Sequence, residues 1–337
     1  MTLAGTYLSM FRAVDATAAP RELASLGRAT AWLNSLALTP ESLAGKVVVV
    51  NFWTYTCINW LRTLPYVRAW SQRYRQGLVV IGVHTPEFPI ERNVDNVRHA
   101  VQQMGVEYPI VIDNDYAIWR AFDNQYWPAL YVIDASGRIR QHHFGEGEYE
   151  ASEIGIQRLL DEARIAGGGR GVASVEGRGV EAPADWEDLK SGENYVGYGR
   201  TERFASRGGI GPDRRRAYVV PGRLALNEWA LGGEWTIGRE ATVLNGPTGR
   251  MAYQFHARDL HLVMGPGREG KPIRFRVLLD GHPPGNAHGL DIDASGNGVV
   301  VEPRLYQLIR QPKPIVDRQF EIEFLSSNVE TFSFTFG

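Results

Sequence analysis

The feature that most constrains the fold is a regular alternation of short apolar runs with longer amphipathic segments between Lys46 and Leu160. The apolar runs are rich in β-branched residues, as strands are, and the segments between them are long enough to form helices. Strands separated by such helices indicate an α/β layer with some parallel pairing. In chain order the segments read KVVVVNFW, LRTLPYVRAWSQRYRQ, LVVIGVHT, NVDNVRHAVQQMG, YPIVIDN, PALYVIDASGRIRQHHFG and EASEIGIQRLLDEARIA.

The pattern changes in the middle of the chain. Residues 166–179 read AGGGRGVASVEGRG, a composition too rich in glycine to pack, which indicates a linker. Beyond it, short β-type runs alternate with Gly, Pro and Asn, as in an antiparallel sandwich or jelly roll. The sequence therefore predicts an N-terminal extension (1–45), an α/β domain (46–165), a linker (166–180) and an all-β domain (181–337).

Charge and composition exclude several classes of partner. The formal charge of -2, from 36 basic and 38 acidic residues, predicts no nucleic-acid partner. No run of about 18 uncharged apolar residues is present, and the opening MTLAGTYLSMFRAVDATAAP does not resemble a secretory leader. We therefore expect a cytoplasmic protein without a membrane span. The single cysteine, Cys57, allows no intramolecular disulfide and no cysteine-based zinc site, in agreement with a reducing compartment.

Cys57 is expected where a β-branched strand, ending at about Trp53, gives way to a helix. The unpaired N-H groups and the dipole at a helix start favour the thiolate, so we expect a lowered pKa and a reactive thiol. The polar neighbours Thr54, Thr56 and Asn59 agree with this hypothesis. The alternative is an inert core residue, because lone cysteines are often small buried side chains.

Four features of this half resemble the thioredoxin superfamily, in particular the AhpC/TSA-redoxin branch with a DipZ-type domain. An FW pair precedes Cys57 as in the FW-x-x-x-C signature, and Pro65 stands where these folds kink the first active-site helix. Trp127-Pro128 followed by ALYVIDASGRI matches the cis-proline, strand and hairpin, and HTPEF follows the second strand. The resemblance implies a thioredoxin-like domain, with a central mixed sheet flanked by helices.

The resemblance also implies that Pro128 forms a cis peptide beside the thiol, in a groove where an extended substrate pairs with the Trp127 backbone. An ordinary proline at the start of a strand is the alternative. We predict Cys57, Thr54 and Pro128 as the catalytic set. The predicted substrate groove consists of Trp53, Trp60, Tyr126, Trp127, His84 and Glu87.

His84 and Glu87 follow a strand whose end should lie at the active-site edge of the sheet. A histidine there could stabilise a thiolate and a carboxylate could accept its proton, whereas the alternative for both is ordinary loop structure. Arg62, in the first turns of the helix, is either a third polar neighbour of the thiol or a solvated surface residue.

Two positions depart from the family. Trp60 replaces the resolving cysteine, so a mixed disulfide at Cys57 cannot be released by an internal thiol. Asn51 occupies the position at which thioredoxin carries a buried acid that assists that thiol. The two-cysteine reaction of thioredoxin is therefore not expected here.

Three functions remain for Cys57. In the first, it exchanges with a protein disulfide or glutathione adduct, and an external thiol such as glutathione or a thioredoxin resolves the product. In the second, it is an antioxidant one-cysteine peroxidase in cell redox homeostasis, which reduces a hydroperoxide by way of a sulfenic acid. Thr54 resembles the threonine of the T-x-x-C motif in peroxiredoxins, but Val50 stands where those enzymes carry a proline. In the third, the fold binds a peptide or carbohydrate without catalysis. None of the three needs a cofactor.

The second domain resembles the β-sandwich extension of DipZ-like proteins, which is related in kind to carbohydrate-binding modules. The stretches that carry this resemblance are NYVGYGRTERFASRGG, RLYQLIRQ and the closing FTFG. Aromatic side chains could stack on sugar rings or simply fill the sandwich core, and the domain could instead cap or orient the redox domain. The aromatic candidates are Trp186, Tyr195, Tyr198, Trp229 and Trp235.

The stretch DIDASGNGVVVE has the spacing of a calcium loop, with Asp291, Asp293, Ser295 and Glu302 as weak candidate ligands. Such a loop normally joins two helices, and here a proline follows it directly. A β-turn rich in Asp and Gly is therefore the favoured interpretation, and no metal is expected.

Overall fold

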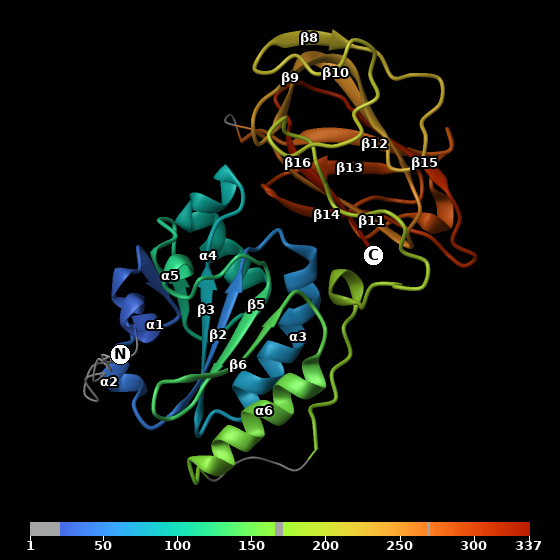
Figure 1. The fold of residues 1–337 in the computed structure, drawn as a ribbon. Helices are drawn as coiled ribbons and strands as arrows, with labels where there is room; N and C mark the ends of the chain where they lie inside the picture. The colour runs from blue at the N-terminus through green and yellow to red at the C-terminus, as the bar shows by residue number, and fades with distance from the viewer. Residues whose placement is uncertain (1–20, 166–170, 268–269) are drawn as a thin grey trace, which may run out of the picture.

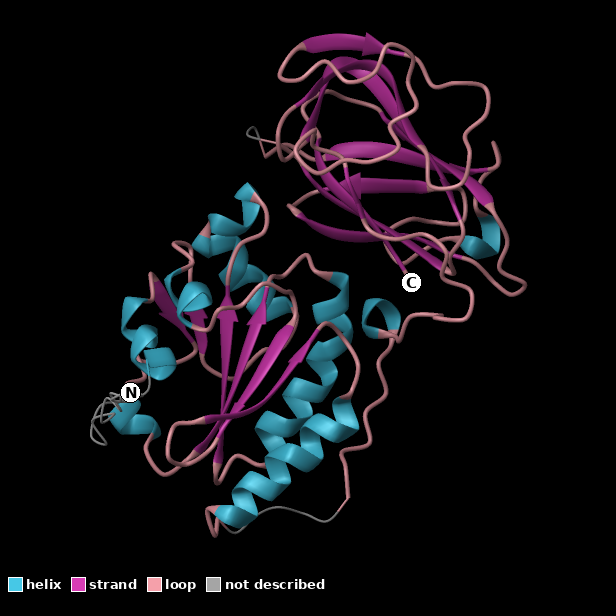
Figure 2. Cartoon of the chain, viewed as in Figure 1, coloured by secondary structure: helices cyan, strands magenta, loops and turns pink. Residues whose placement is uncertain are grey.

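The structure, a computed structural model, describes residues 21–165, 171–267 and 270–337. Two domains follow one another along the chain, the first of helices packed on a sheet and the second almost entirely of strands and loops (Figure 1, Figure 2). This architecture confirms the predicted fold class. Residues 1–20 of the predicted extension and 166–170 of the predicted linker lie outside the described residues.

The first domain has one six-stranded mixed sheet in the order β1-β4-β3-β2-β5-β6. β2, β3 and β4 are parallel, and the other pairings are antiparallel. All seven side chains of β2 are buried, as a central strand covered on both faces requires. Strand bounds are β1 Ala31–Leu33, β2 Val47–Trp53, β3 Leu78–His84, β4 Ile110–Ile112, β5 Ala129–Ile133 and β6 Ile139–Phe144. The sheet thus already begins within the segment predicted as an extension.

Helices cover both faces of this sheet. Apolar side chains of α3, α4 and α6 share one hydrophobic cluster with one face, and those of α1, α2 and α5 share another with the opposite face. The bounds are α1 Arg21–Ala24, α2 Pro40–Leu43, α3 Ile58–Arg73, α4 Val94–Gln103, α5 Ala117–Ala121 and α6 Tyr149–Glu162, with the 3-10 helices η1 Ser25–Arg28 and η2 Pro89–Arg92. None of the helices in the described part of the chain is both long and apolar enough to cross a bilayer.

The second domain is an antiparallel sheet of ten strands wrapped around a core of its own. Its main path is β13-β12-β15-β10-β16-β11-β14, with β7 on β16, β9 on β10 and β8 on β9. The bounds are β7 Asn194–Tyr195, β8 Arg215–Tyr218, β9 Trp229–Ile237, β10 Thr242–Phe255, β11 Asp259–Gly265, β12 Ile273–Leu279, β13 Asn297–Val300, β14 Arg304–Arg310, β15 Arg318–Phe324 and β16 Glu330–Phe336; η4 is Gly285–Ala287.

The described part of the linker packs against the first domain, so the prediction that it would not pack is wrong there. The Ala173 amide donates to both oxygens of Glu153 on α6, at 2.9 Å each. Arg68 on α3 donates to both carboxylate oxygens of Glu181, at 2.7 Å, where the chain forms the 3-10 helix η3 Gly179–Glu181. Side chains of the helices thus supply the partners that a glycine-rich backbone needs.

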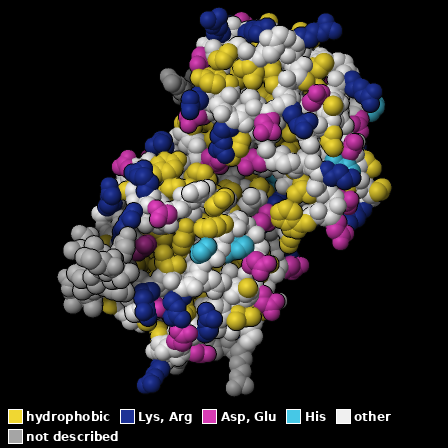
Figure 3. Space-filling model, in the orientation of Figure 1, with side chains coloured by type: hydrophobic (Ala, Val, Ile, Leu, Met, Phe, Trp, Pro, Cys, Tyr) yellow, Lys and Arg dark blue, Asp and Glu magenta, His cyan; other side chains and the backbone are white. Residues whose placement is uncertain are grey.

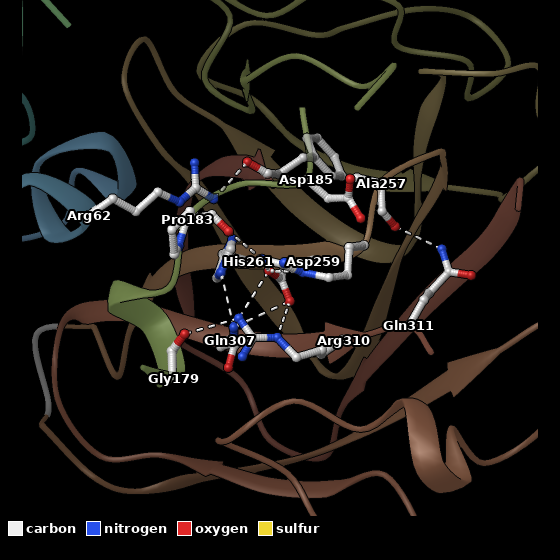
Figure 4. A network of polar contacts seen from close by, with 12 residues as sticks. Arg62, Gly179, Pro183, Asp185, Ala257, Asp259, His261, Gln307, Arg310 and Gln311 are labelled. Atoms are coloured by element: carbon white, nitrogen blue, oxygen red, sulfur yellow. Dashed lines mark hydrogen bonds and ion pairs between the residues drawn. The ribbon is translucent and has the colours of Figure 1, made fainter. Parts of the chain in front are cut away.

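The two domains share a core and a polar network. Val263, Leu305 and Phe332 of the second domain belong to the apolar cluster of the first, and the Phe332 ring lies 5.2 Å from that of Phe88. In Figure 4, Arg62 of α3 reaches a carbonyl oxygen in the closing strand of the second domain. The space-filling view shows hydrophobic side chains gathered on the first domain, close to the junction between the two domains (Figure 3).

Candidate thiol active site

Cys57 caps the N-terminus of α3, in the strand-turn-helix arrangement expected from the sequence. Its backbone is extended, with φ -76° and ψ 112°, and its carbonyl accepts the Leu61 amide at 3.0 Å. The thiol is free and partly exposed, and Sγ lies 3.9 Å from the carbonyl oxygen of Trp127. The thiol therefore faces the segment that leads into β5, across the mouth of the helix.

The segment that faces the thiol consists of Tyr126, Trp127 and Pro128, which lead into β5. The Trp127-Pro128 peptide is cis, as the resemblance implied. The Trp127 indole donates to the Thr85 carbonyl at 3.0 Å, which fixes its ring, while Tyr126 is 51% exposed. The Trp127 carbonyl therefore lies beside the Cys57 thiol, whereas Pro128 is buried. That Tyr126 and Trp127 line a substrate groove stays a prediction.

Trp53 and Trp60 do not lie in this groove, so their assignment to it is wrong. Both are fully buried, and their rings stack at 4.2 Å. The Trp60 indole donates to the Asn51 Oδ1 at 2.9 Å. The large ring of Trp60, in the first turn of α3, therefore points into the core. Trp60 and Asn51, the two positions that the sequence analysis sets apart from the family, contact each other there.

Thr54, predicted as catalytic, and His84, predicted in the substrate groove, are also fully buried, so neither side chain lies at an accessible surface. The Thr54 hydroxyl lies 3.5 Å from the His84 Nε2, and the His84 ring packs edge-on against Trp53 at 4.9 Å. Burial lowers the pKa of His84 to about 3, so the ring is neutral at pH 7 and brings no positive charge to a thiolate.

Glu87 is held by the second domain. Its Oε1 accepts the Tyr195 hydroxyl at 2.6 Å and the Arg200 guanidinium at 2.8 Å. The carboxylate is thus largely covered, with 8% of its side chain exposed. Sequence reasoning could place Glu87 at the edge of the first sheet but could not supply partners more than a hundred residues further along the chain.

Glu91 was missed by the sequence analysis. Its carboxylate accepts the Phe88 amide at 2.8 Å and the Thr56 hydroxyl at 2.5 Å. Burial raises its pKa to about 7. A glutamate three residues into η2 is a helix-capping signal that could have been recognised in the sequence.

The electrostatic surroundings of Cys57 contradict the expected low pKa. Burial raises the pKa of the thiol well above its usual value, and the carboxylates of Glu193 and Glu87 raise it further. Hydrogen bonds from the Trp60 and Asn59 amides at the start of α3 lower the pKa of the thiol, but their effect is smaller than that of burial and the carboxylates. Glu193 keeps surface open to solvent, so water weakens its effect. The helix start was visible in the sequence, whereas the nearby acids of the second domain were not.

Arg62 is neither beside the thiol nor solvated, contrary to both expectations. It is 3% exposed and forms an ion pair with Glu146 at 2.9 Å. Its Nη2 donates to the Phe336 carbonyl at 3.2 Å. Arg62 therefore joins α3 to the last strand of the second domain.

Most aromatic candidates of the second domain are structural. Trp229 and Trp235 are fully buried in its core, so they are not available to stack on a sugar. Tyr195 contacts Glu87, and the Tyr198 hydroxyl donates to Asp213 at 2.9 Å. Only Trp186, at 64% exposed, presents a largely open ring among these five.

The weak calcium candidates do not form a metal site. Asp291 pairs with Arg304 at 2.7 Å, and Asp293 accepts the Asn297 amide at 2.9 Å in a turn. Glu302 contacts His99 at 2.9 Å. No group of three acidic, histidine or cysteine side chains within the described ranges could hold a metal ion. Ser295 lies in a turn, as the favoured β-turn interpretation requires.

Known proteins resemble the chain in both domains. Residues 34–142 match the AhpC/TSA family, and residues 191–337 match a family described as a thioredoxin-like C-terminal domain. Protein DipZ of Mycobacterium tuberculosis is 33% identical over 323 residues, which cover 91% of this chain and 42% of DipZ. The chain thus spans less than half the length of that relative.

Two further known proteins are similar to part of the chain. Thiol-disulfide oxidoreductase YkuV of Bacillus subtilis is 28% identical over 132 residues, 39% of this chain and 89% of YkuV. The solution structure of a thioredoxin-like protein in the oxidized form is 30% identical, covers 40% of this chain and 90% of that one, and gives a TM-score of 0.37.

Proposed function

Because the chain belongs to the thioredoxin-like AhpC/TSA family and carries the thioredoxin-like C-terminal domain, we propose that it is a monothiol thiol-disulfide oxidoreductase with Cys57 as nucleophile. One observation carries the proposal: a free, partly exposed thiol at the start of α3 lies 3.9 Å from the Trp127 carbonyl, beside Pro128. The relative YkuV, whose name states this activity, supports the reaction class.

The reaction has two exchange steps. The Cys57 thiolate attacks one sulfur of a substrate disulfide, the substrate S-S bond breaks, and the released thiolate takes up a proton. An external thiolate then attacks the substrate sulfur of the mixed disulfide, and Cys57 leaves as a thiolate. The chain has no second cysteine to do this, and a buried Trp60 fills the position where one would stand. We propose that the external thiol is glutathione or a thioredoxin in a reducing cytoplasm.

The surroundings of the thiol make the first step dependent on pH. Since burial and two nearby carboxylates raise the pKa of Cys57, little thiolate is present at pH 7 in the free protein. A substrate that brings positive charge to Glu193 would lower this pKa on binding, so exchange would be faster with such substrates.

The two alternatives have weaker support. A one-cysteine peroxidase needs a low thiol pKa and a hydroxyl that reaches the peroxide, whereas Thr54 is fully buried. A non-catalytic peptide-binding protein remains compatible with the raised thiol pKa, and substitution of Cys57 separates it from the oxidoreductase.

The test is to expose the protein to glutathione disulfide and to follow its intact mass. We expect one glutathione adduct, formed faster at higher pH, removed by added glutathione and absent from Cys57→Ser. If the folded protein forms no adduct at any pH while the unfolded chain does, the groove serves binding alone. Rapid sulfenic acid formation by hydroperoxide, without exchange with glutathione disulfide, would instead identify a peroxidase.

A further inference from the structure

A loop of the second domain contacts Glu87, one of the acidic residues near Cys57. This loop, residues 195–200 (YVGYGR), begins the stretch that the sequence analysis singled out without giving it a function. Tyr195 and Arg200 both bind Glu87, and the Arg200 guanidinium carbon lies 3.4 Å from the centre of the Tyr195 ring. The loop therefore presents a fixed guanidinium to the first domain.

Two glycines allow the loop to pack directly on the turn between β9 and β10. A Cβ at Gly197 would lie 2.5 Å from the Glu240 carbonyl carbon, and one at Gly199 would lie 2.9 Å from the Arg239 carbonyl oxygen. The Gly199 amide donates to that same oxygen at 2.9 Å. Close packing of these backbones places the side chains of Arg239 and Glu240 beside the loop.

Together these residues enclose a recess of about 160 Å³ between the domains. Glu87 and Arg200 neutralise each other within it. Arg239 and Glu240, by contrast, are exposed and form no ion pair with another described residue. The recess thus offers one free guanidinium and one free carboxylate next to each other.

That pair of charges is complementary to an α-amino acid group. A guanidinium binds a carboxylate through two parallel hydrogen bonds, and a carboxylate accepts hydrogen bonds from an ammonium group. Glu87 belongs to both the recess and the surroundings of Cys57. Its carboxylate lines the recess and also raises the pKa of the Cys57 thiol.

We infer that this recess binds the amino-acid end of the low-molecular-weight thiol that resolves the Cys57 mixed disulfide, a ligand of the glutathione class. Its sulfur attacks the substrate sulfur, the bond to Cys57 Sγ breaks, the new disulfide departs, and the Cys57 thiolate takes up a proton from solvent. The resolving role rests on the proposed function, whereas binding to the recess does not.

Titration calorimetry with S-methylglutathione, which cannot reduce a disulfide, tests binding separately from sulfur chemistry. We expect the two-domain chain to bind it, and Arg239→Ala to weaken binding at least about tenfold through loss of a charge-assisted pair. Glu240→Gln should weaken binding as well. Arg276→Ala, which removes an exposed arginine of β12, is the matched control and should bind as the wild type does. Absence of binding, or equal binding by Arg239→Ala and Arg276→Ala, would overturn the inference.

A second readout connects the recess to resolution. Once Cys57 carries a mixed disulfide, its release by glutathione should be slower in Arg239→Ala, while release by uncharged mercaptoethanol should be unchanged. Equal loss with both thiols would show a general structural effect and contradict specific recognition. If Cys57 forms no mixed disulfide, the proposed function fails, and the calorimetric result still decides whether the recess is a binding site.

Discussion

Replacement of Trp60 should show that this position, at which the family resemblance predicts a resolving cysteine, is part of the core. Trp60 is fully buried, stacks on Trp53 at 4.2 Å and donates to Asn51 at 2.9 Å. Removal of a buried aromatic side chain costs about 3–5 kcal/mol, and an unpaired buried Asn51 oxygen adds about 1–3 kcal/mol. Since such terms overlap, we expect Trp60→Ala to lower the free energy of unfolding by about 4–6 kcal/mol.

Urea denaturation followed by circular dichroism measures this loss. Trp60→Phe, which keeps a ring but loses the indole donor, should lose only about 1–3 kcal/mol. Trp60→Cys, which would rebuild the two-cysteine motif, should be nearly as unstable as Trp60→Ala because it leaves a similar cavity. Trp186→Ala is the control, since its ring is 64% exposed, and it should change stability by less than about 0.5 kcal/mol. A loss below about 1 kcal/mol for Trp60→Ala would refute the reasoning.

Three further predictions concern charge. Glu193→Gln should lower the pKa of Cys57 and raise its alkylation rate by about two- to fivefold at pH 9, where the Glu193 carboxyl, whose pKa burial raises to about 8, is ionised; an unchanged iodoacetamide rate would contradict the assigned electrostatic effect. Arg62→Ala should lower the free energy of unfolding by about 3 kcal/mol, because Glu146 stays buried without its cation; denaturant titration checks this, and a loss near zero would argue against a structural ion pair. Glu91 has a pKa raised from 4.5 to about 7, so its contribution to stability is fully present below pH 4.5 and is lost as the pH rises through about 7. Unfolding free energies measured from pH 4 to 8 should therefore fall relative to those of Glu91→Gln, by roughly 3 kcal/mol in all, and parallel curves would contradict the shifted pKa.

Local sequence signals were sufficient for the framework of the first domain. The β-branched run of β2 followed by the start of α3 places Cys57 at a helix N-terminus, a prediction that depends only on neighbours in sequence. The cis Trp127-Pro128 peptide is expected instead from the resemblance to the thioredoxin superfamily.

Burial and long-range electrostatics could not be predicted in the same way. The sequence predicts an accessible site for Thr54 and Trp60 because they lie three residues from Cys57, and for His84 because it follows a strand that ends at the active-site edge of the sheet; packing turns all three into the interior. Glu193 and Arg200 come from the second domain, and nothing in a local pattern indicates which loop of a β-sandwich will meet the thiol. The raised pKa of Cys57 follows from these tertiary contacts rather than from the helix start.

Catalysed reduction of a glutathionylated peptide by glutathione is the measurement that tests the central claim most directly. We predict multiple turnovers by the wild-type protein, a rate that rises between pH 7 and 9, and only the uncatalysed rate with Cys57→Ser. The pH trend follows from the raised thiol pKa, because a larger thiolate fraction forms as the pH rises. Equal rates with wild type and Cys57→Ser across this range would contradict the assignment of Cys57 as a redox nucleophile.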